Sequence, residues 1–211
     1  MSTRRALARQ LGVVVGFEDP DPALEQYHTP PEIAAHLVHV ADLQGDIDDR
    51  TVVDLGAGTG MLALAAALRG AERVVGIDID VGPLVTAREN ERHVGSTTDV
   101  DWVRGDATRC PLGVDRRAGT TVVMNPPFGA QDGNEGADRA FLETARAIAD
   151  VSYSVHNAGS ESFVEAYAGD NGGTVTHAFQ AELTIDRQFE FHDRESASID
   201  AECFRIEWRA N

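Results

Sequence analysis

Lysine is absent from this chain of 211 residues, so arginine supplies every basic side chain apart from histidine. Acidic residues outnumber Lys and Arg by 35 to 18, which gives a formal net charge of −17 at pH 7. Such repulsion would destabilise an ordinary compact domain, but at about 1 M salt the screening length is only about 3 Å. The composition therefore favours adaptation to molar salt, and we expect a halophilic archaeon as the source. A basic or membrane-binding partner is the weaker interpretation, because the acidic residues are spread along the chain.

Cysteine and long apolar runs are also scarce. Cys110 and Cys203 lie far apart with no paired pattern, so we expect both thiols to be reduced and structural. No apolar stretch approaches the length of a membrane span, and Met1–Arg5 lacks the apolar core of a signal peptide. No His and Cys residues have zinc-ligand spacing. The sequence thus predicts a cytoplasmic location, no membrane segment and no metal site.

Hydrophobic periodicity and turn residues predict strands that alternate with helices before two final strands close the chain. This order predicts a doubly wound, mostly parallel α/β sheet of seven strands with an antiparallel C-terminal hairpin. We expect a single domain over 1–211, with a helical extension over 1–50 and a Rossmann-like core over 51–211. The strands are expected at 51–55, 73–77, 100–104, 120–124, 151–156, 175–191 and 199–208, and the helices at 3–11, after Thr29, and at 61–68, 83–93, 137–149 and 161–168.

A glycine-rich turn follows the first expected strand. Asp54–Gly60 reads Asp-Leu-Gly-Ala-Gly-Thr-Gly, and an apolar helix begins directly after it. Glycines let the backbone approach a ligand, and a helix N-terminus favours negative charge. Met61 stands where the third glycine of the dinucleotide fingerprint would fall. Asp78 ends the next strand, where a carboxylate can accept from both ribose hydroxyls, whereas we interpret Asp80 as the cap of the following helix. The arrangement indicates a nucleotide cofactor.

A second motif, Val122–Gly129, ends the fourth expected strand with Asn-Pro-Pro-Phe-Gly. Asn125 therefore stands at the carboxyl end of a buried strand, where open α/β sheets bind ligands. Pro126 and Pro127 hold the preceding residues extended and remove two donors while keeping their carbonyls. An amide, a carbonyl and the Phe128 ring suit a planar base with an exocyclic amine. The alternative for a lone Asn-Pro-Pro is a simple strand-ending turn.

Two other polar residues have competing interpretations. Asp106 follows the strand at 100–104, where it could accept from an adenine amine or be an ordinary loop residue. Thr29 precedes two prolines and could cap the next helix, with Glu32 closing a capping box. Capping alone would explain Thr29.

Three motifs together resemble a class I methyltransferase that uses S-adenosylmethionine, namely Asp54–Gly60, Gly76–Asp80 and Asn125–Gly129. The more specific resemblance is to the methyltransferase-like protein 5 family, which modifies adenine N6 in small-subunit ribosomal RNA. It spans nearly the whole chain and rests on further stretches, namely Gly16–Glu18, Leu24–Tyr27 with Thr29, Ala140–Leu142 and Tyr153–His156. The resemblance implies the Rossmann-like fold of class I methyltransferases.

The same resemblance implies the site residues and a partner. Base contacts would come from Asn125, Pro126, Pro127 and Phe128, and His28 stands at a variable position that we expect on the surface. Family members also work with a small zinc-binding activator protein that pairs with the sheet edge. The apolar candidates for that contact are Val100, Trp102 and Val103, although a Trp there could equally be core. The implied cofactor contacts are Gln26, Tyr27, Thr29, Asp54, Gly56, Gly58, Thr59, Met61, Asp78 and Asp106.

These observations predict a methyltransferase for adenine N6 in 16S ribosomal RNA. One alternative is a glutamine N5-methyltransferase acting on a translation release factor, because a glutamine amide offers a similar planar amine. Such enzymes usually have Tyr after Asn-Pro-Pro, so Phe128 and Leu24–Tyr27 favour RNA. Another alternative is an inactive RNA scaffold that binds the methyl donor. The intact motif at Asn125 argues against it.

Overall fold

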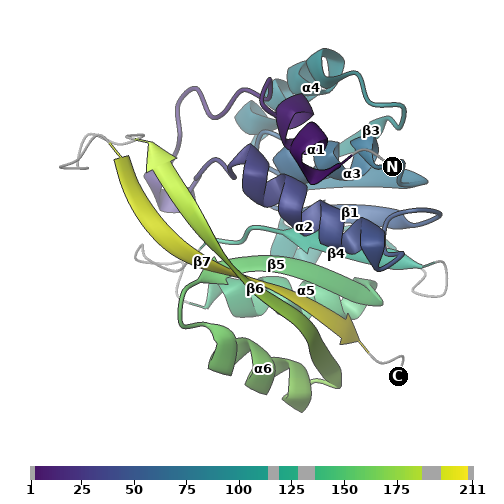
Figure 1. Ribbon diagram of the computed structural model, residues 1–211, viewed down its shortest axis with the longest axis vertical. Helices are drawn as coiled ribbons and strands as arrows, with labels where there is room; N and C mark the ends of the chain where they lie inside the picture. The colour runs from purple at the N-terminus through teal and green to yellow at the C-terminus, as the bar shows by residue number, and fades with distance from the viewer. Residues whose placement is uncertain (1–2, 114–118, 128–135, 187–195, 209–211) are drawn as a thin grey trace.

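The computed structural model describes residues 3–113, 119–127, 136–186 and 196–208. Within these ranges a sheet of seven strands has the order β3-β2-β1-β4-β5-β7-β6 (Figure 1). All neighbours from β3 to β5 pair in parallel, whereas β7 is antiparallel to β5 and β6. The predicted fold class is confirmed. The strands are β1 (Thr51–Leu55), β2 (Arg73–Asp78), β3 (Val100–Arg104), β4 (Thr120–Met124), β5 (Val151–Asn157), β6 (Gly173–Asp186) and β7 (Ser196–Trp208).

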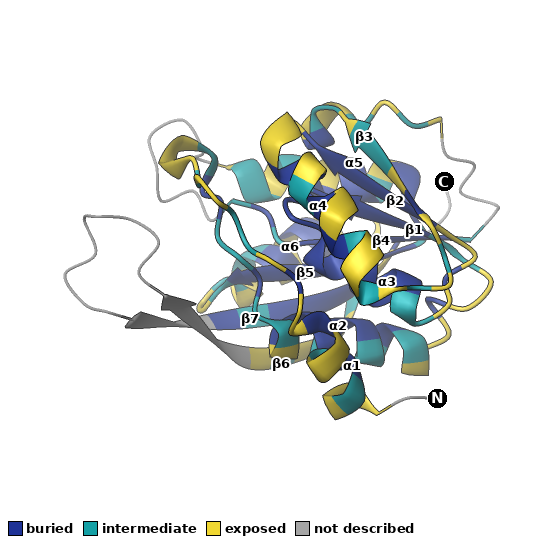
Figure 2. Cartoon of the chain, turned by 90° about the horizontal axis from the view of Figure 1, so that it is seen from above, coloured by how far each residue is buried: buried dark blue, intermediate teal, exposed yellow. Residues whose placement is uncertain are grey.

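Helices cover both faces of the sheet, and their outer sides are exposed (Figure 2). One buried cluster joins α1, α2 and α3 to one face, and a second joins α5 and α6 to the other. The helices are α1 (Arg4–Leu11), α2 (Pro31–Leu43), α3 (Met61–Leu68), α4 (Val81–Val94), α5 (Ala137–Ile148) and α6 (Glu161–Asp170), with short 3-10 helices η1 (Pro22–Leu24) and η2 (Ala107–Arg109).

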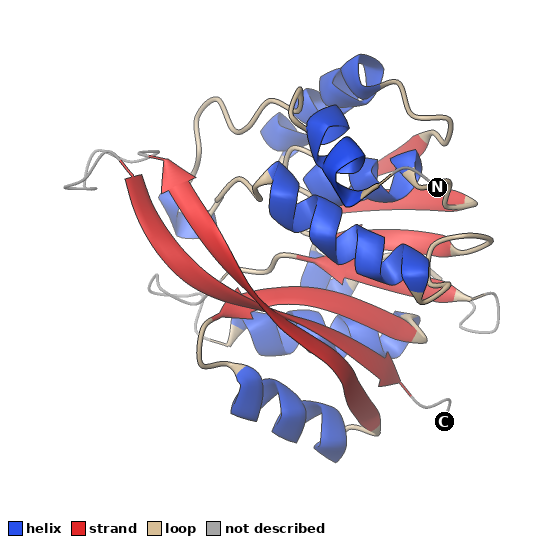
Figure 3. Ribbon diagram, in the orientation of Figure 1, coloured by secondary structure: helices blue, strands red, loops and turns tan. Residues whose placement is uncertain are grey.

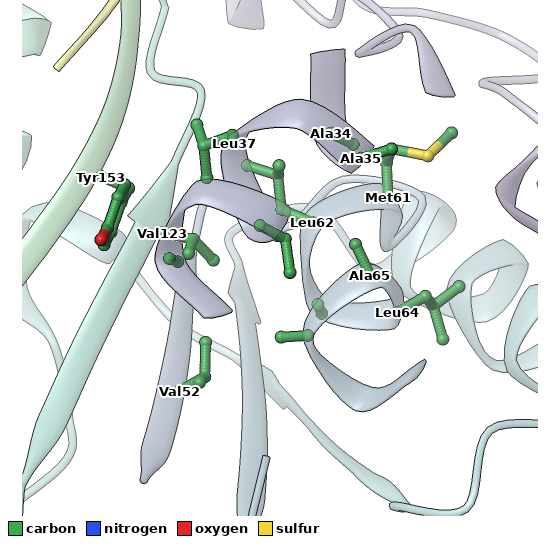
Figure 4. Close-up of a cluster of buried hydrophobic side chains, with 14 of the residues drawn as sticks. Ala34, Ala35, Leu37, Val52, Met61, Leu62, Leu64, Ala65, Val123 and Tyr153 are labelled. Atoms are coloured by element: carbon green, nitrogen blue, oxygen red, sulfur yellow. The ribbon is translucent and has the colours of Figure 1, made fainter. Parts of the chain in front are cut away.

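Helix α3 is apolar around its whole circumference because it lies between the sheet and the N-terminal helices. Its residues Met61–Ala67 are all buried. Figure 4 shows this layer, with α2 and α3 packed over Val52, Val123 and Tyr153 of the strands. Leu7 and Leu11 of α1 are fully buried in the same cluster. Burial of each such Leu stabilises the fold by about 1.5–3 kcal/mol. The N-terminal helices therefore share a core with the sheet.

A buried ionic cluster joins segments that are far apart in sequence. Asp46 Oδ2 accepts hydrogen bonds from the Tyr153 hydroxyl at 2.6 Å and from Arg205 Nε at 2.8 Å. Burial and the Asp46 carboxylate raise the pKa of Tyr153, so its hydroxyl stays protonated and donates. Removing one partner would leave a buried charge uncompensated, at a cost of about 3–5 kcal/mol. The cluster thus fixes the segment before β1 against β5 and β7.

The structure corrects the expected start of α2. Its N-cap is Pro30 and makes no side-chain capping bond, so Thr29 is not the cap. By contrast Asp80 caps α4 as expected, since its side chain accepts from Gly82 N. The expected loop Gln131–Gly136 lies outside the described residues except for Gly136.

The two strands of the C-terminal hairpin, β6 and β7, are longer than the other strands of the sheet (Figure 3). Pairing between β5 and β7 stops at Asn157 and Ala201, whereas β6 and β7 stay paired as far as Asp186 and Ser196. The expected hairpin is confirmed, but the sequence did not predict that β7 lies between β5 and β6.

The described residues contain no helix that is long and apolar enough to cross a membrane. They also contain no group of three or more His, Cys, Asp or Glu side chains that could hold a metal ion. Both cysteines are free thiols. Cys203 is fully buried in β7, and burial raises the pKa of its thiol to about 12.

Candidate active site

Two adjoining cavities lie at the edge where the parallel strands end. The larger encloses about 410 Å³ and the smaller about 30 Å³, and both are lined by Phe17, Tyr27, Gly56, Gly58 and Asn125. Between them they are lined by all the predicted site residues except Pro126 and Phe128. Phe128 lies outside the described residues. Stretches separated by up to a hundred positions thus meet at one place.

The glycine turn adopts backbone that other residues rarely adopt. Gly58 and Gly60 have φ angles of 53° and 93°. A Cβ on Gly58 would lie 2.9 Å from the Phe17 ring, and one on Gly60 would lie 2.7 Å from the Trp102 ring. Side chains at these positions would be strained and would clash with aromatic rings. The turn therefore depends on glycine both for conformation and for close packing.

Asp78 has a structural role that the sequence did not reveal. Its Oδ2 accepts from Gly58 N at 2.7 Å, and its Oδ1 accepts from Asp80 N at 2.9 Å. Burial raises the pKa of Asp78, while these backbone donors oppose the rise. Each carboxylate oxygen keeps a further lone pair, and the side chain lines the larger cavity. Asp78 therefore anchors the glycine turn and stays available to ribose hydroxyls.

Asp54 lies at the end of β1, beside the smaller cavity. Its Oδ2 accepts from Ala63 N in the first turn of α3 at 2.8 Å, but Oδ1 is buried without a partner among the described residues. Burial, the largest cause, raises the pKa of this carboxyl to about 7. A buried acceptor without a donor costs about 1–3 kcal/mol. A positively charged ligand group here would satisfy Oδ1 and restore the ionised form.

Asn90 of α4 is a buried positioning residue that the sequence analysis missed. Its amide accepts from Val15 N at 2.8 Å and donates to Val15 O at 2.9 Å, as a neighbouring strand would. The same Nδ2 donates to Thr59 O at 2.9 Å. A buried Asn in the middle of a helix was the available signal, since such amides need specific partners. Asn90 thereby ties the segment that carries Phe17 to the glycine turn.

Gln26 also joins two segments, here the loop before α2 and the residues that follow β2. Its Oε1 accepts from Asp21 N at 2.7 Å, and its Nε2 donates to Asp80 Oδ2 at 2.9 Å. Gln26 is buried, and both it and Tyr27 line the larger cavity. The bonds hold the loop before α2 over the end of β2.

Asn125 begins the segment after β4. Its Nδ2 donates to Thr29 Oγ1 at 2.9 Å, while its Oδ1 is buried without a partner among the described residues. In this arrangement the Thr29 bond engages the nitrogen end of the amide. Asn125 presents an acceptor at the cavities, and Pro127 lines the larger one beside it.

Asp106 has the role of an ordinary loop residue, and its contact with an adenine amine stays a prediction. Its Oδ1 accepts from Thr108 N at 2.9 Å and from Thr108 Oγ1 at 2.6 Å. The bond from the Thr108 hydroxyl is the main reason that the pKa of Asp106 is lowered. Asp106 is thus an ordinary cap of η2 that also lines the larger cavity with an ionised carboxylate.

Known proteins share this architecture. Residues 34–150 match the family model described as Methyltransferase small domain. Over 205 residues the chain is 37% identical to the Drosophila melanogaster protein rRNA N(6)-adenosine-methyltransferase Mettl5, covering 96% of this chain and 95% of that protein. The chain belongs to the METTL5 family.

Further relatives agree with this assignment. METTL5 of Danio rerio, also named an rRNA N(6)-adenosine-methyltransferase, is 35% identical, with 92% of this chain and 93% of that protein covered. The crystal structure of PH1948 from Pyrococcus horikoshii, a candidate RNA methyltransferase, superposes with a TM-score of 0.87 at 35% identity and full coverage of both chains. This METTL5-family chain is a methyltransferase that uses S-adenosylmethionine.

The residues of this METTL5-family site fit that cofactor. Asp54 Oδ1, which has no partner among the described residues, suits an ammonium group at the smaller cavity. The larger cavity combines the Asp78 carboxylate, which suits vicinal ribose hydroxyls, with Ile79 and Phe141, which suit an aromatic base. The individual contacts remain predictions.

The β3 edge differs from the expected apolar surface in this METTL5-family chain. Trp102 is half-buried, donates from Nε1 to Glu91 Oε2 at 2.8 Å, and packs so closely on Gly76 that a Cβ there would lie 2.5 Å from its ring. Val100 is buried, and Val103 packs against the core of the other face. The side chains of Val100, Trp102 and Val103 therefore pack against the protein core. What β3 leaves available as an edge strand is its backbone.

His28 also departs from expectation. We expected it on the surface, but it is half-buried, packs against Gly16 and lines the smaller cavity.

Proposed function

We propose that the chain methylates N6 of an adenosine in small-subunit (16S) ribosomal RNA. The names of the Drosophila melanogaster and Danio rerio relatives support this substrate class. The observation that carries the proposal is the Asn125 amide, whose Nδ2 donates to Thr29 and whose buried Oδ1 has no partner in the described part of the chain. An exocyclic amine has two hydrogens to donate, and an acceptor held in this way matches one of them.

The chemistry rests mainly on positioning. The target adenosine is extruded from its stack, because a base inside a helix cannot reach such a site. Asn125 Oδ1 and the Pro126 carbonyl accept from the two N6 hydrogens, and Phe128 stacks on the ring. When bound, the cofactor supplies an electrophilic methyl group. The two acceptors orient the amine lone pair and stabilise positive charge that develops on nitrogen. A strong general base is not needed if the proton leaves after transfer.

The partner proposed from the sequence remains a small zinc-binding activator protein at β3. Since Val100 and Trp102 pack inward, pairing would use the β3 backbone, which ends the described sheet on that side. An uncovered edge strand is also prone to aggregation, so a covering partner would improve solubility. Action on ribosomal RNA implies a cytoplasmic location.

The test is to map methylated adenines in 16S ribosomal RNA from cells with and without this gene. One adenine should lose its N6-methyl group in the deletion strain and regain it with the wild-type gene. The matched control is Asn125→Ala, which should not restore the mark although the purified variant binds S-adenosylhomocysteine normally. Unchanged ribosomal RNA together with loss of glutamine methylation on a release factor would refute the RNA proposal.

A further inference from the structure

Three residues that line the smaller cavity each carry a buried polar atom with no hydrogen-bond partner among the described residues. The atoms are His28 Nδ1, Asp54 Oδ1 and Asn125 Oδ1. The cavity of about 30 Å³ has room for a group of a few atoms and connects through shared lining residues to the larger one. Unpartnered buried polar atoms are rare in native proteins and each requires an explanation. The three atoms differ in whether they can donate a hydrogen bond. Asn125 Oδ1 and the ionised Asp54 Oδ1 can only accept, whereas His28 Nδ1 can carry a proton and donate.

The chain fixes His28 in place. The residue lies between Tyr27 and Thr29, which line the same cavity, and Thr29 is held by Asn125. The ring also packs against Gly16, where a Cβ would come within 3.4 Å of Cγ and Nδ1. Burial lowers the pKa of His28, so the imidazole is neutral near pH 7 and carries one proton on either nitrogen.

The pair formed by His28 and Asp54 is complementary to an α-amino acid. A zwitterion of this kind presents an ammonium group, which needs an anionic acceptor, and a carboxylate, which needs a donor. Asp54 Oδ1 provides the acceptor, and His28 Nδ1–H can provide the donor. S-adenosylmethionine carries such a group at the end opposite its adenine. Asn125 Oδ1 then remains for the substrate amine.

We propose that His28 is a positioning residue for the amino-acid end of the cofactor, with Nδ1–H donating to the α-carboxylate. The proposal concerns cofactor binding, so it holds or fails independently of which nucleotide is methylated. Asp54 holds the ammonium group, and the two side chains together fix the sulfonium-bearing arm of the molecule relative to Asn125.

The test uses ligands that differ at this end alone. Titration calorimetry on the full chain at constant high KCl would compare three ligands, namely S-adenosylhomocysteine, its analogue lacking only the carboxylate, and 5′-methylthioadenosine. His28→Phe keeps an aromatic ring but removes Nδ1, and His28→Asn keeps a donor near that position. His28→Phe should weaken S-adenosylhomocysteine about tenfold or more, as expected for a lost hydrogen bond to a charged group. His28→Asn should lose less affinity for S-adenosylhomocysteine than His28→Phe. Neither variant should alter the affinity for the two ligands that lack the carboxylate.

Two results would overturn the proposal. Equal weakening of all three ligands would show that His28 only supports the fold of the site, and unchanged affinity for S-adenosylhomocysteine would show that it makes no contact. If His28→Phe does not fold, as judged by circular dichroism, the wild-type protein supplies the answer. The ¹⁵N resonance of His28 Nδ1 should then shift with S-adenosylhomocysteine but not with the decarboxylated analogue. A resonance that responds equally to both would exclude the carboxylate contact.

Discussion

Asn125 Nδ2 donates to Thr29 Oγ1 over 2.9 Å, and this bond leaves the amide oxygen of Asn125 as the acceptor at the cavities. An asparagine amide can rotate by half a turn with little change of shape, so a neighbouring group must decide which end faces a ligand. In the structure the Thr29 hydroxyl engages Nδ2, so Oδ1 is the end left at the cavities. The residue expected to cap α2 instead holds the amide in place.

Replacing Thr29 by Val should therefore impair methyl transfer. Val keeps the shape of Thr but removes the acceptor, so the amide loses its fixed orientation. We expect kcat to fall about tenfold or more, in keeping with the cost of misplaced groups in active sites. Thr29→Ser, which keeps the hydroxyl, is the matched control. Steady-state kinetics showing equal kcat for Thr29→Val and wild type would contradict this role.

Cofactor binding should release a proton near neutral pH. Burial raises the pKa of Asp54 to about 7, so the carboxyl is about half protonated at that pH in the cofactor-free protein. An adjacent ammonium group favours the ionised form and lowers the pKa, so binding expels the proton and affinity rises as pH increases towards 7. Titration calorimetry at pH 6.5 in buffers of different ionisation enthalpy measures the release. Asp54→Asn should show none, whereas equal release from that variant would assign the proton to another group.

Asn90→Ala should destabilise the protein and loosen the segment before Phe17. The substitution removes three hydrogen bonds of a buried side chain, to Val15 N, Val15 O and Thr59 O. Because backbone groups are left without partners, we expect a loss of about 2–4 kcal/mol in the free energy of unfolding. Denaturant unfolding and limited proteolysis would measure the two effects. The exposed neighbour Glu89 supplies the control, and Glu89→Ala should behave as wild type in both assays.

RNA binding should depend weakly on salt while the fold is intact. Contacts to phosphate draw much of their free energy from counterion release, which shrinks in molar salt. Base stacking contributes about 1–3 kcal/mol per base and is less affected, so Phe128 should supply more affinity than Arg4, Arg5 and Arg9 on α1. RNA affinity would be measured against KCl concentration, with circular dichroism followed in parallel. A steep loss of affinity with rising salt in folded protein would show that phosphate contacts dominate.

The sequence was sufficient for the elements but not for how they meet. The bounds predicted for β1, β3, β4 and α3 are those observed, because glycines, prolines and polar residues interrupt their apolar runs sharply. The position of β7 could not be predicted, since its alternating pattern fits beside β5 or at the far edge equally well. In both cases one face of the strand would be buried.

For the candidate site too, the sequence indicated individual residues but not the contacts between them. Asp78 and Asn125 were predicted from residue type and position at strand ends, where α/β proteins bind ligands, and both line the cavities. Asn90 and the role of Thr29 were not, because both depend on hydrogen bonds between segments that no local pattern connects. A sequence shows which groups can bond, whereas their partners follow from the packing of helices on the sheet.

The place of β7 has a consequence for synthesis of the chain. Strand β7 emerges from the ribosome after β5 and β6 but is inserted between them. Arg205, which bonds Asp46 and the Tyr153 hydroxyl, arrives with it. Until then the edge of β5 has no neighbour on that side, and the buried Asp46 carboxylate lacks its cation. A nascent chain of this protein can therefore complete the described sheet only once β7 has left the exit tunnel.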